Sequence, residues 1–197
     1  MEREEYKWAC PPWEVKMKNR ELLIGVTGGI AAFKTAALVS RLVQAGAGVS
    51  VVMTRSATRL IGPKTFEALT GRPVRTAIFG RGGHPHIELA RRAEVLCIAP
   101  ATANILAKTA LGLADDLLST VVLAFDGPIL MAPAMNCEMW RKRAVERNVA
   151  QLRADGVVLV DPEEGYLSCG ELGAGRMAAP ETIFQAIEKQ LERSAKK

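Results

Sequence analysis

Five short apolar runs, separated by longer amphipathic stretches, dominate the sequence from residue 21 onward. The runs cover residues 22–26, 49–53, 95–99, 129–132 and 157–160. Their length and their lack of polar positions are typical of strands that are buried on both faces. The stretches between and after them predict helices over residues 30–45, 63–69, 104–110, 116–124, 138–155 and 180–192. This alternation predicts an α/β fold, with a doubly wound parallel sheet between two helical layers.

The first 20 residues differ from the rest of the chain because they show no periodic apolar pattern. We expect residues 1–20 to form an N-terminal extension and residues 21–197 to form a single domain, since a chain of this length can bury one self-sufficient core. The extension has no apolar segment or cleavage site typical of a secretory signal. No apolar run approaches the roughly 20 residues that cross a bilayer. We therefore expect a cytoplasmic protein with no membrane partner.

Cysteine spacing and net charge exclude several classes of site. Cys10, Cys97, Cys137 and Cys169 are widely separated and form no CxxC pair, so we expect free thiols and no metal site. The formal net charge of +5 is modest, and no nucleic-acid-binding motif accompanies it. We expect no nucleic-acid partner. A phosphorylated small ligand would explain part of the basicity equally well.

A glycine-containing loop follows the first predicted strand and leads directly into a helix. In the sequence Gly-Val-Thr-Gly-Gly-Ile over residues 25–30, Gly28 and Gly29 permit a close backbone approach, and the Thr27 hydroxyl can donate to a phosphate oxygen. Free N–H groups from Ile30 onward and the positive end of the helix dipole would attract the same anion. The loop departs from GxGxxG, which weakens a dinucleotide interpretation, and a plain tight turn is the alternative.

Two further strand ends carry groups that suit a phosphorylated ligand. Thr54 and Ser56 follow the second run, and Thr102, Ala103 and Asn104 follow the third. Helix capping alone would account for some of these side chains. Because the carboxyl ends of parallel strands meet at one edge of a sheet, the three loops together predict one pocket for a mononucleotide.

Four segments resemble the phosphopantothenoylcysteine decarboxylases, which belong to the homo-oligomeric flavin-containing cysteine decarboxylases. They are residues 25–30, residues 99–104 with 112–120, the PAMNCEMW segment of residues 133–140, and the CGELGAGRM segment of residues 169–177. The last two are the most specific, and the resemblance covers residues 21–185. It implies a flavodoxin-like fold, FMN as cofactor, a homotrimer as the basic unit, and an active site between subunits.

The same resemblance implies roles for individual residues. His86 matches the catalytic histidine, Asn136 the residue that holds the substrate, and Cys169 the proton donor on a glycine-rich flap. Plainer alternatives are a packing histidine, a helix N-cap and an inert thiol. The resemblance adds Ala134 to the residues that contact the cofactor, and Met139, Arg91 and Gly170 to those that contact the substrate.

The implied reaction is the FMN-dependent decarboxylation of 4'-phosphopantothenoylcysteine to 4'-phosphopantetheine in coenzyme A biosynthesis. Three alternatives share the fold or the cofactor: a peptidyl-cysteine decarboxylase of lantibiotic synthesis, a flavin prenyltransferase, and a non-catalytic flavin-binding regulatory subunit. The Asn136 and Cys169 motifs favour the decarboxylation of 4'-phosphopantothenoylcysteine over these three alternatives. Arg92 stands where many relatives have Trp, which puts local packing in doubt. Many bacterial relatives continue into a synthetase domain, so we expect the ligase to be a separate polypeptide.

Overall fold

A five-stranded parallel sheet forms the centre of a computed structural model that describes residues 17–79, 83–166, 170 and 172–194. The strands are β1 (Glu21–Val26), β2 (Gly48–Met53), β3 (Val95–Ala101), β4 (Ile129–Pro133) and β5 (Val158–Leu159). Their order is β2-β1-β3-β4-β5, the flavodoxin-like order. The chain reverses its direction of winding between β1 and β3. A ligand crevice is expected there, outside the carboxyl ends of those two strands.

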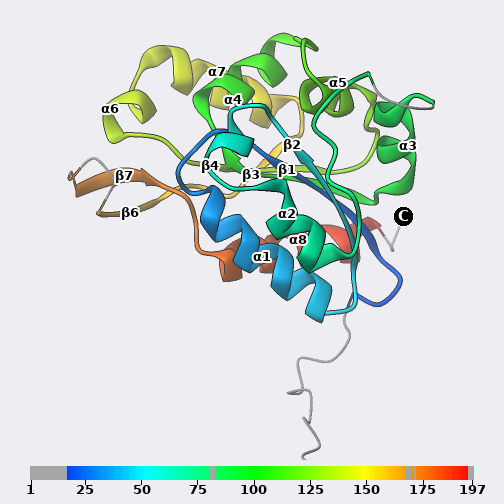
Figure 1. Cartoon of the computed structure of the whole chain (residues 1–197). Helices are drawn as coiled ribbons and strands as arrows, with labels where there is room; N and C mark the ends of the chain where they lie inside the picture. Colours follow the sequence, from blue (N-terminus) through cyan, green and yellow to red (C-terminus); the bar gives the residue numbers. More distant parts are fainter. Residues whose placement is uncertain (1–16, 80–82, 167–169, 171, 195–197) are drawn as a thin grey trace, which may run out of the picture.

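Helices cover both faces of the sheet (Figure 1). One face carries α1 (Ala32–Gln44), α2 (Pro63–Thr70) and α8 (Pro180–Ser194), and α1 packs on both of the others. The other carries α3 (Pro85–Arg92), α4 (Ala103–Leu111), α5 (Leu117–Ala124) and α7 (Arg143–Ala154). The arrangement confirms the predicted three-layer, doubly wound α/β class.

Two apolar cores lie between the sheet and its helical layers. Neighbouring residues of β1 divide between them: Ile24 packs under α1, whereas Leu23 packs on the opposite face. Because both faces of the strand are buried, nearly every position must be apolar. This requirement explains why the strands stand out in the sequence as uninterrupted apolar runs.

The predicted strands and most predicted helices are present, but the segment over residues 138–155 is two helices. The first is α6 (Cys137–Trp140) and the second is α7. Lys142 separates them in an extended conformation, with φ −70° and ψ 134°. The helix α6 contacts a strand beside the site, while α7 packs on α4. Each helix therefore needs its own direction, which a continuous helical periodicity does not reveal.

A helix, a hairpin and a short 3₁₀ helix, η1 (Ala57–Arg59), were not predicted. The helix α3 is short and buries only Ala90, so its periodic signal is weak, although Pro85 occupies a position typical of a helix start. An antiparallel hairpin of β6 (Glu163–Tyr166) and β7 (Leu172–Arg176) flanks the stretch predicted as a glycine-rich flap. Residues 167–169 and 171 lie outside the described residues.

The described chain begins at Met17, whose side chain is fully buried against the α1 face. Its backbone N–H donates to the Ala45 carbonyl oxygen at 3.2 Å. Only the last four residues of the expected extension are described. Within the described ranges, no helix combines the length and the apolar character required to span a bilayer.

Candidate functional site

A cavity of about 550 Å³ opens at the carboxyl ends of β1, β3 and β4. The switch point between β1 and β3 forms part of its wall, as the strand order requires. Its volume falls in the range of small-molecule and cofactor sites. The lining residues are Gly28, Gly29, Ile30, Ala31, Phe33, Lys34, Thr102, Ala103, Ala134, Met135, Asn136, Met139, Tyr166, Gly175, Arg176 and Met177.

The β1–α1 loop packs closely on its neighbours at two glycine positions. A Cβ atom at Gly28 would lie 2.4 Å from the Ser56 Cβ, and one at Gly29 would lie 3.3 Å from the Pro100 ring. Among the described residues, no side chain caps the start of α1. The Ala32 and Lys34 N–H groups donate to the Gly29 and Ala31 carbonyl oxygens, both at 2.9 Å. In the described structure, the backbone donors left for an anion here are those of Ile30, Ala31 and Phe33.

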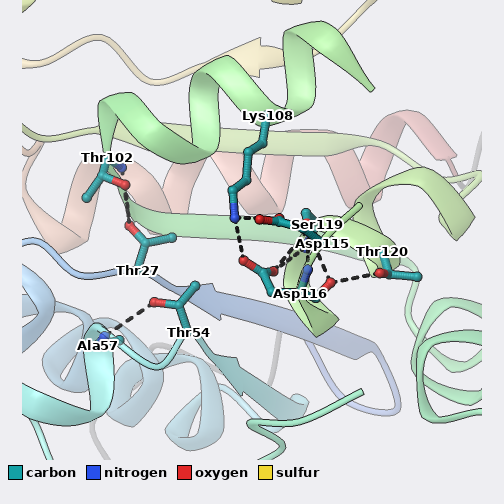
Figure 2. Close-up of polar contacts among 9 residues, drawn as sticks. All are labelled: Thr27, Thr54, Ala57, Thr102, Lys108, Asp115, Asp116, Ser119 and Thr120. Carbon is teal, nitrogen blue, oxygen red and sulfur yellow. Dashed lines mark hydrogen bonds and ion pairs between the residues drawn. The ribbon is translucent and has the colours of Figure 1, made fainter. Parts of the chain in front are cut away.

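The Thr27 hydroxyl group lies beneath this loop, where it contacts protein rather than the cavity. It donates to the Pro100 carbonyl oxygen at 2.7 Å, and it accepts from the Thr102 N–H at 3.2 Å. The residue is 2% exposed. Its single proton is thus engaged in a buried hydrogen bond to the protein, and the donation from Thr27 to a phosphate stays a prediction. Thr102, whose hydroxyl lies 3.2 Å from that of Thr27 (Figure 2), does line the cavity.

The other predicted cofactor residues divide between the cavity wall and its surroundings. Ala103 and Ala134 line the cavity, whereas Thr54, Ser56 and Asn104 do not. The Thr54 hydroxyl accepts from the Ala57 N–H at 3.3 Å (Figure 2), at the start of a short 3₁₀ helix whose N-cap residue, Ser56, makes no side-chain capping bond. Ser56 packs against Gly28 and therefore shapes the loop from behind.

The β4–α6 loop brings two predicted substrate residues, Asn136 and Met139, into the cavity wall. The Asn136 Oδ1 accepts from the Glu138 N–H at 2.7 Å, so this residue is also the N-cap of α6. The cap fixes the orientation of the amide group relative to the cavity. The Met135 N–H donates to the Gly175 carbonyl oxygen at 2.9 Å, which joins the loop to β7.

Glycines in β7 allow the hairpin to approach α6 and its loop. A Cβ atom at Gly173 would lie 2.9 Å from the Cys137 Cβ, and one at Gly175 would lie 2.2 Å from the Met135 carbonyl oxygen. Gly175 also has a φ of +142°, which L-residues rarely adopt. The hairpin is thus held directly against the segment that carries Asn136.

His86 and Arg91 lie on α3, away from the cavity of the same chain. The helix packs on α5, and Figure 1 shows it at the opposite end of the molecule from α6. Neither residue lines the cavity. The centroid of the His86 ring lies 5.9 Å from that of the His84 ring, in an edge-to-face arrangement. The His86 Nδ1 is buried with no hydrogen-bond partner among the described residues. One subunit therefore does not bring His86 and Asn136 together.

Cys169 lies outside the described residues, so its distance from Asn136 is not defined. Gly170 is described and exposed, with a φ of +88°, but it does not line the cavity. Cys97 and Cys137 are both buried. Burial raises the pKa of Cys97 to about 12, so that thiol stays protonated and has a structural role.

Comparison with known proteins assigns the fold and its motifs to one family. A family model described as Flavoprotein matches residues 12–192, nearly the whole chain. The chain belongs to the flavoprotein family. It is 47% identical over 176 residues to the coenzyme A biosynthesis bifunctional protein CoaBC of Bacillus subtilis (strain 168), covering 88% of this chain but 43% of that protein. The chain thus spans less than half the length of this curated relative.

The chain matches two solved flavoprotein structures over almost their whole length. One is a PPC decarboxylase mutant complexed with pantothenoylaminoethenethiol, with 33% identity, a TM-score of 0.79, and coverage of 88% of this chain and 98% of that one. The other is SpaF, an FMN-dependent cysteine decarboxylase, with 39% identity, a TM-score of 0.78, and coverage of 90% and 98%. The resemblance to phosphopantothenoylcysteine decarboxylases that the motifs indicated is confirmed.

The α4–α5 connection of this flavoprotein is fastened by a cluster of charged and hydroxyl groups (Figure 2). The Lys108 Nζ lies 2.6 Å from the Asp115 Oδ1 and 2.8 Å from the Asp116 Oδ2. Asp116 also caps α5, accepting from the Ser119 N–H at 2.8 Å in a reciprocal capping box. Hydrogen bonds from Lys108 and Ser119 outweigh the opposing effect of burial and lower the pKa of Asp116.

The position of Arg92 resolves the doubt that its substitution for Trp raised. Its Nε lies 2.9 Å from the Glu21 Oε2, and Arg72 binds the same carboxylate through both terminal nitrogens. The arginine therefore forms part of a charged cluster at the end of the sheet opposite to the cavity.

Sequence reasoning missed several large side chains that line the cavity, among them Phe33, Lys34, Tyr166 and Arg176. Lys34 lies in the first turn of α1, immediately after the glycine loop, which was an available signal. Arg176 belongs to the Gly-Arg-Met motif, but the motif alone assigned it no role. Tyr166 was not detectable, because the hairpin that positions it was not predicted.

Proposed function

We propose that this flavoprotein catalyses the FMN-dependent decarboxylation of 4'-phosphopantothenoylcysteine to 4'-phosphopantetheine in coenzyme A biosynthesis. The observation that carries the proposal is one cavity whose wall contains both the loop Gly28–Ile30, which suits an anion, and the side chain of Asn136, which is held in place as the N-cap of α6. Relatives named for coenzyme A biosynthesis and for PPC decarboxylase activity support the same reaction. Residues 21–197 would act as one decarboxylase domain, with residues 1–20 as an extension.

The cavity fits FMN on physical grounds. A mononucleotide phosphate needs backbone donors and a close approach, which Gly28, Gly29 and the start of α1 provide. Thr102 adds a hydroxyl group, and the apolar walls at Ala103 and Ala134 suit an aromatic ring. Loss of carbon dioxide from a carboxylate on a saturated carbon requires an electron sink, which the substrate alone does not contain. Bound FMN would supply it as a two-electron acceptor.

The side chains of the protein would bind the substrate and move its protons. Asn136, whose Oδ1 is held by the Glu138 N–H, would orient its amide toward the substrate carboxylate. His86 would accept the proton of the substrate thiol, since an imidazole nitrogen can act as a general base. Cys169 would return a proton to the carbon that loses the carboxylate. Met139 and Gly170 would contact the substrate.

Separation of His86 from Asn136 within one chain supports an active site between subunits. Ile30 and Phe33, at the mouth of the cavity, are 59% and 64% exposed, and apolar side chains of this size favour burial against a partner. We propose that a second copy of the chain covers them and supplies His86 and Arg91 from its own α3. A closed ring of three copies would satisfy each cavity in the same way.

The proposal is tested by mass spectrometry of the turnover product. The protein reconstituted with FMN should convert 4'-phosphopantothenoylcysteine to 4'-phosphopantetheine with release of carbon dioxide. Asn136→Asp should abolish turnover, whereas Cys169→Ser should decarboxylate but accumulate the enethiol. Accumulation of the enethiol by the unaltered protein would instead favour the peptidyl-cysteine type of reaction. Absence of any product from a flavin-loaded protein would refute the proposal.

A further inference from the structure

Two cationic side chains face the same cavity from different elements. Lys34 lies in the first turn of α1 and Arg176 at the end of β7, and both line the cavity together with Tyr166. The described lining residues include no Asp or Glu. Figure 1 shows the chain that leaves β7 passing beside the start of α1, which agrees with a contact from the Lys34 Nζ to the Met177 carbonyl oxygen at 3.4 Å.

These two charges are poorly compensated within the described part of the chain, where neither cation forms an ion pair with a carboxylate. The Arg176 side chain lies over Gly165, where an added Cβ would come within 3.1 Å of its guanidinium. Glu163 is the carboxylate whose charge raises the pKa of Lys34, but its Oε1 accepts from the Ala179 N–H at 2.8 Å. An anion in the cavity would meet two cations and no competing carboxylate.

The state of Lys34 agrees with this geometry. Partial burial lowers its pKa, and the nearby positive charge of Arg176 lowers it further, against a smaller opposite effect of Glu163. The two positive charges repel each other at a partly buried position, so the cavity is electrostatically unfavourable when it holds no anion. A doubly charged anion placed between them would reverse this effect, since it attracts both groups at once.

The cavity then contains two places for a phosphate monoester, and the proposed reaction brings two of them. The glycine loop and Thr102 offer neutral backbone and hydroxyl donors at the switch point. Lys34 and Arg176 offer charged donors on the side of the β6–β7 hairpin. The first place suits the flavin phosphate, which leaves the cationic place for the other ligand.

We propose that Lys34 and Arg176 bind the terminal phosphate of the substrate and so select a phosphorylated small molecule over a peptide that ends in cysteine. The inference rests on the proposed function and deepens it. A peptide would bring no phosphate monoester to this position. The two cations would therefore set substrate class without taking part in the loss of carbon dioxide.

The test compares phosphorylated and unphosphorylated ligands on the FMN-loaded protein. The unaltered protein should turn over 4'-phosphopantothenoylcysteine with a KM at least about tenfold below that for pantothenoylcysteine, the gain expected from charge-assisted hydrogen bonds. Lys34→Gln and Arg176→Gln should each raise the first KM about tenfold and leave the second unchanged. Lys189→Gln, at an exposed position of α8, is the matched control and should change neither.

Binding measurements separate this inference from the proposed function. Calorimetric titration with 4'-phosphopantetheine and with pantetheine requires no turnover, and the unaltered protein should prefer the phosphorylated compound. Equal affinity for the two compounds would overturn the inference, even where decarboxylation is observed. A variant that loses FMN affinity but keeps the preference would also overturn it, because the cation would then serve the flavin phosphate. A preference without turnover would support the inference and refute the reaction.

Discussion

The Thr27 hydroxyl group links the ends of β1 and β3 at the floor of the cavity. It donates to the Pro100 carbonyl oxygen and accepts from the Thr102 N–H, so one side chain sets the separation of two loops. Both partners are backbone groups near the switch point. A buried hydroxyl group that hydrogen-bonds to a carbonyl and to an N–H group at once fixes the position of one backbone segment relative to the other.

We expect Thr27→Val to lower the free energy of unfolding by about 1–3 kcal/mol, because it leaves two buried backbone groups without a partner. FMN should also dissociate more readily, since Thr102 would lose its fixed position. Urea denaturation and flavin release measure the two effects. Thr27→Ser keeps the hydroxyl group and should retain most of the stability. Equal behaviour of the Val and Ser variants would contradict this role.

Among the secondary-structure elements, the hairpin β6–β7 depends on a glycine for its contact with the Asn136 loop. Gly175 has a positive φ, and a Cβ there would collide with the Met135 carbonyl oxygen. Because the Met135 N–H also donates to the Gly175 carbonyl oxygen, displacement of β7 would break this hydrogen bond. The position of the hairpin and the orientation of Asn136 are therefore coupled.

We expect Gly175→Ala to lower kcat/KM for the proposed substrate by about tenfold or more, as displaced positioning groups do, while the sheet stays folded. Far-ultraviolet circular dichroism and steady-state kinetics measure the two quantities. Gly156→Ala is a suitable control, because Gly156 also has a positive φ but no atom within 4 Å of an added Cβ. Comparable kinetic losses in the two variants would show that backbone strain, rather than the contact with Met135, causes the effect.

The start of α5 provides the second test at this scale, because Asp116 both caps the helix and contacts Lys108. We expect Asp116→Ala to cost about 1–2 kcal/mol at pH 7, the usual effect of a lost N-cap. Asp116→Asn keeps an N-cap acceptor and should cost less. Asp155→Ala, at an exposed side chain, should change stability by less than about 0.5 kcal/mol.

The pH dependence of the same variant follows from the lowered pKa of Asp116. A carboxyl group with a folded-state pKa below its unfolded value of about 3.9 adds stability above that pH. The contribution disappears as the pH falls through the folded-state pKa. The difference in unfolding free energy between the unaltered protein and Asp116→Ala should therefore shrink in acid, as denaturation at pH 7 and at pH 3 would measure. A difference that grows in acid would contradict the assignment.

On the scale of the whole molecule, the fold separates the two halves of the proposed catalytic machinery. The cavity with Asn136 opens at the carboxyl ends of β1, β3 and β4, whereas α3, which carries His86, lies at the opposite end of the molecule from α6. A rigid α/β core does not permit these elements to meet within one chain. The proposed catalysis would then require that two copies of the chain meet at each site.

Mixing two inactive variants tests this requirement. His86→Asn and Asn136→Asp should each be inactive alone, but mixed oligomers contain sites that take one intact residue from each chain. A random equal mixture should regain about a quarter of full activity, since half of the chains supply each intact residue. Subunit exchange is verified by native mass spectrometry. Mixed oligomers without activity would place the complete site within one subunit.

Local sequence determined the elements of this protein wherever burial alone dictates residue type. Parallel strands covered on both faces must be apolar throughout, so β1 to β4 were predicted almost to the residue. Gly28 and Gly29 were identifiable for a similar reason, because a close approach of the backbone excludes side chains. The four motif segments extended these local signals to the family, and the comparisons agree.

Tertiary structure decided how those elements combine. The order of the strands placed Thr27 under the Pro100 carbonyl, set α3 and α6 at opposite ends, and brought Lys34 beside β7. Packing also divided one helical pattern into α6 and α7. A local pattern specifies whether a residue is buried, but hydrogen-bond partners and cavity walls come from segments distant in sequence. Such contacts depend on the path of the whole chain, which no single window of residues contains.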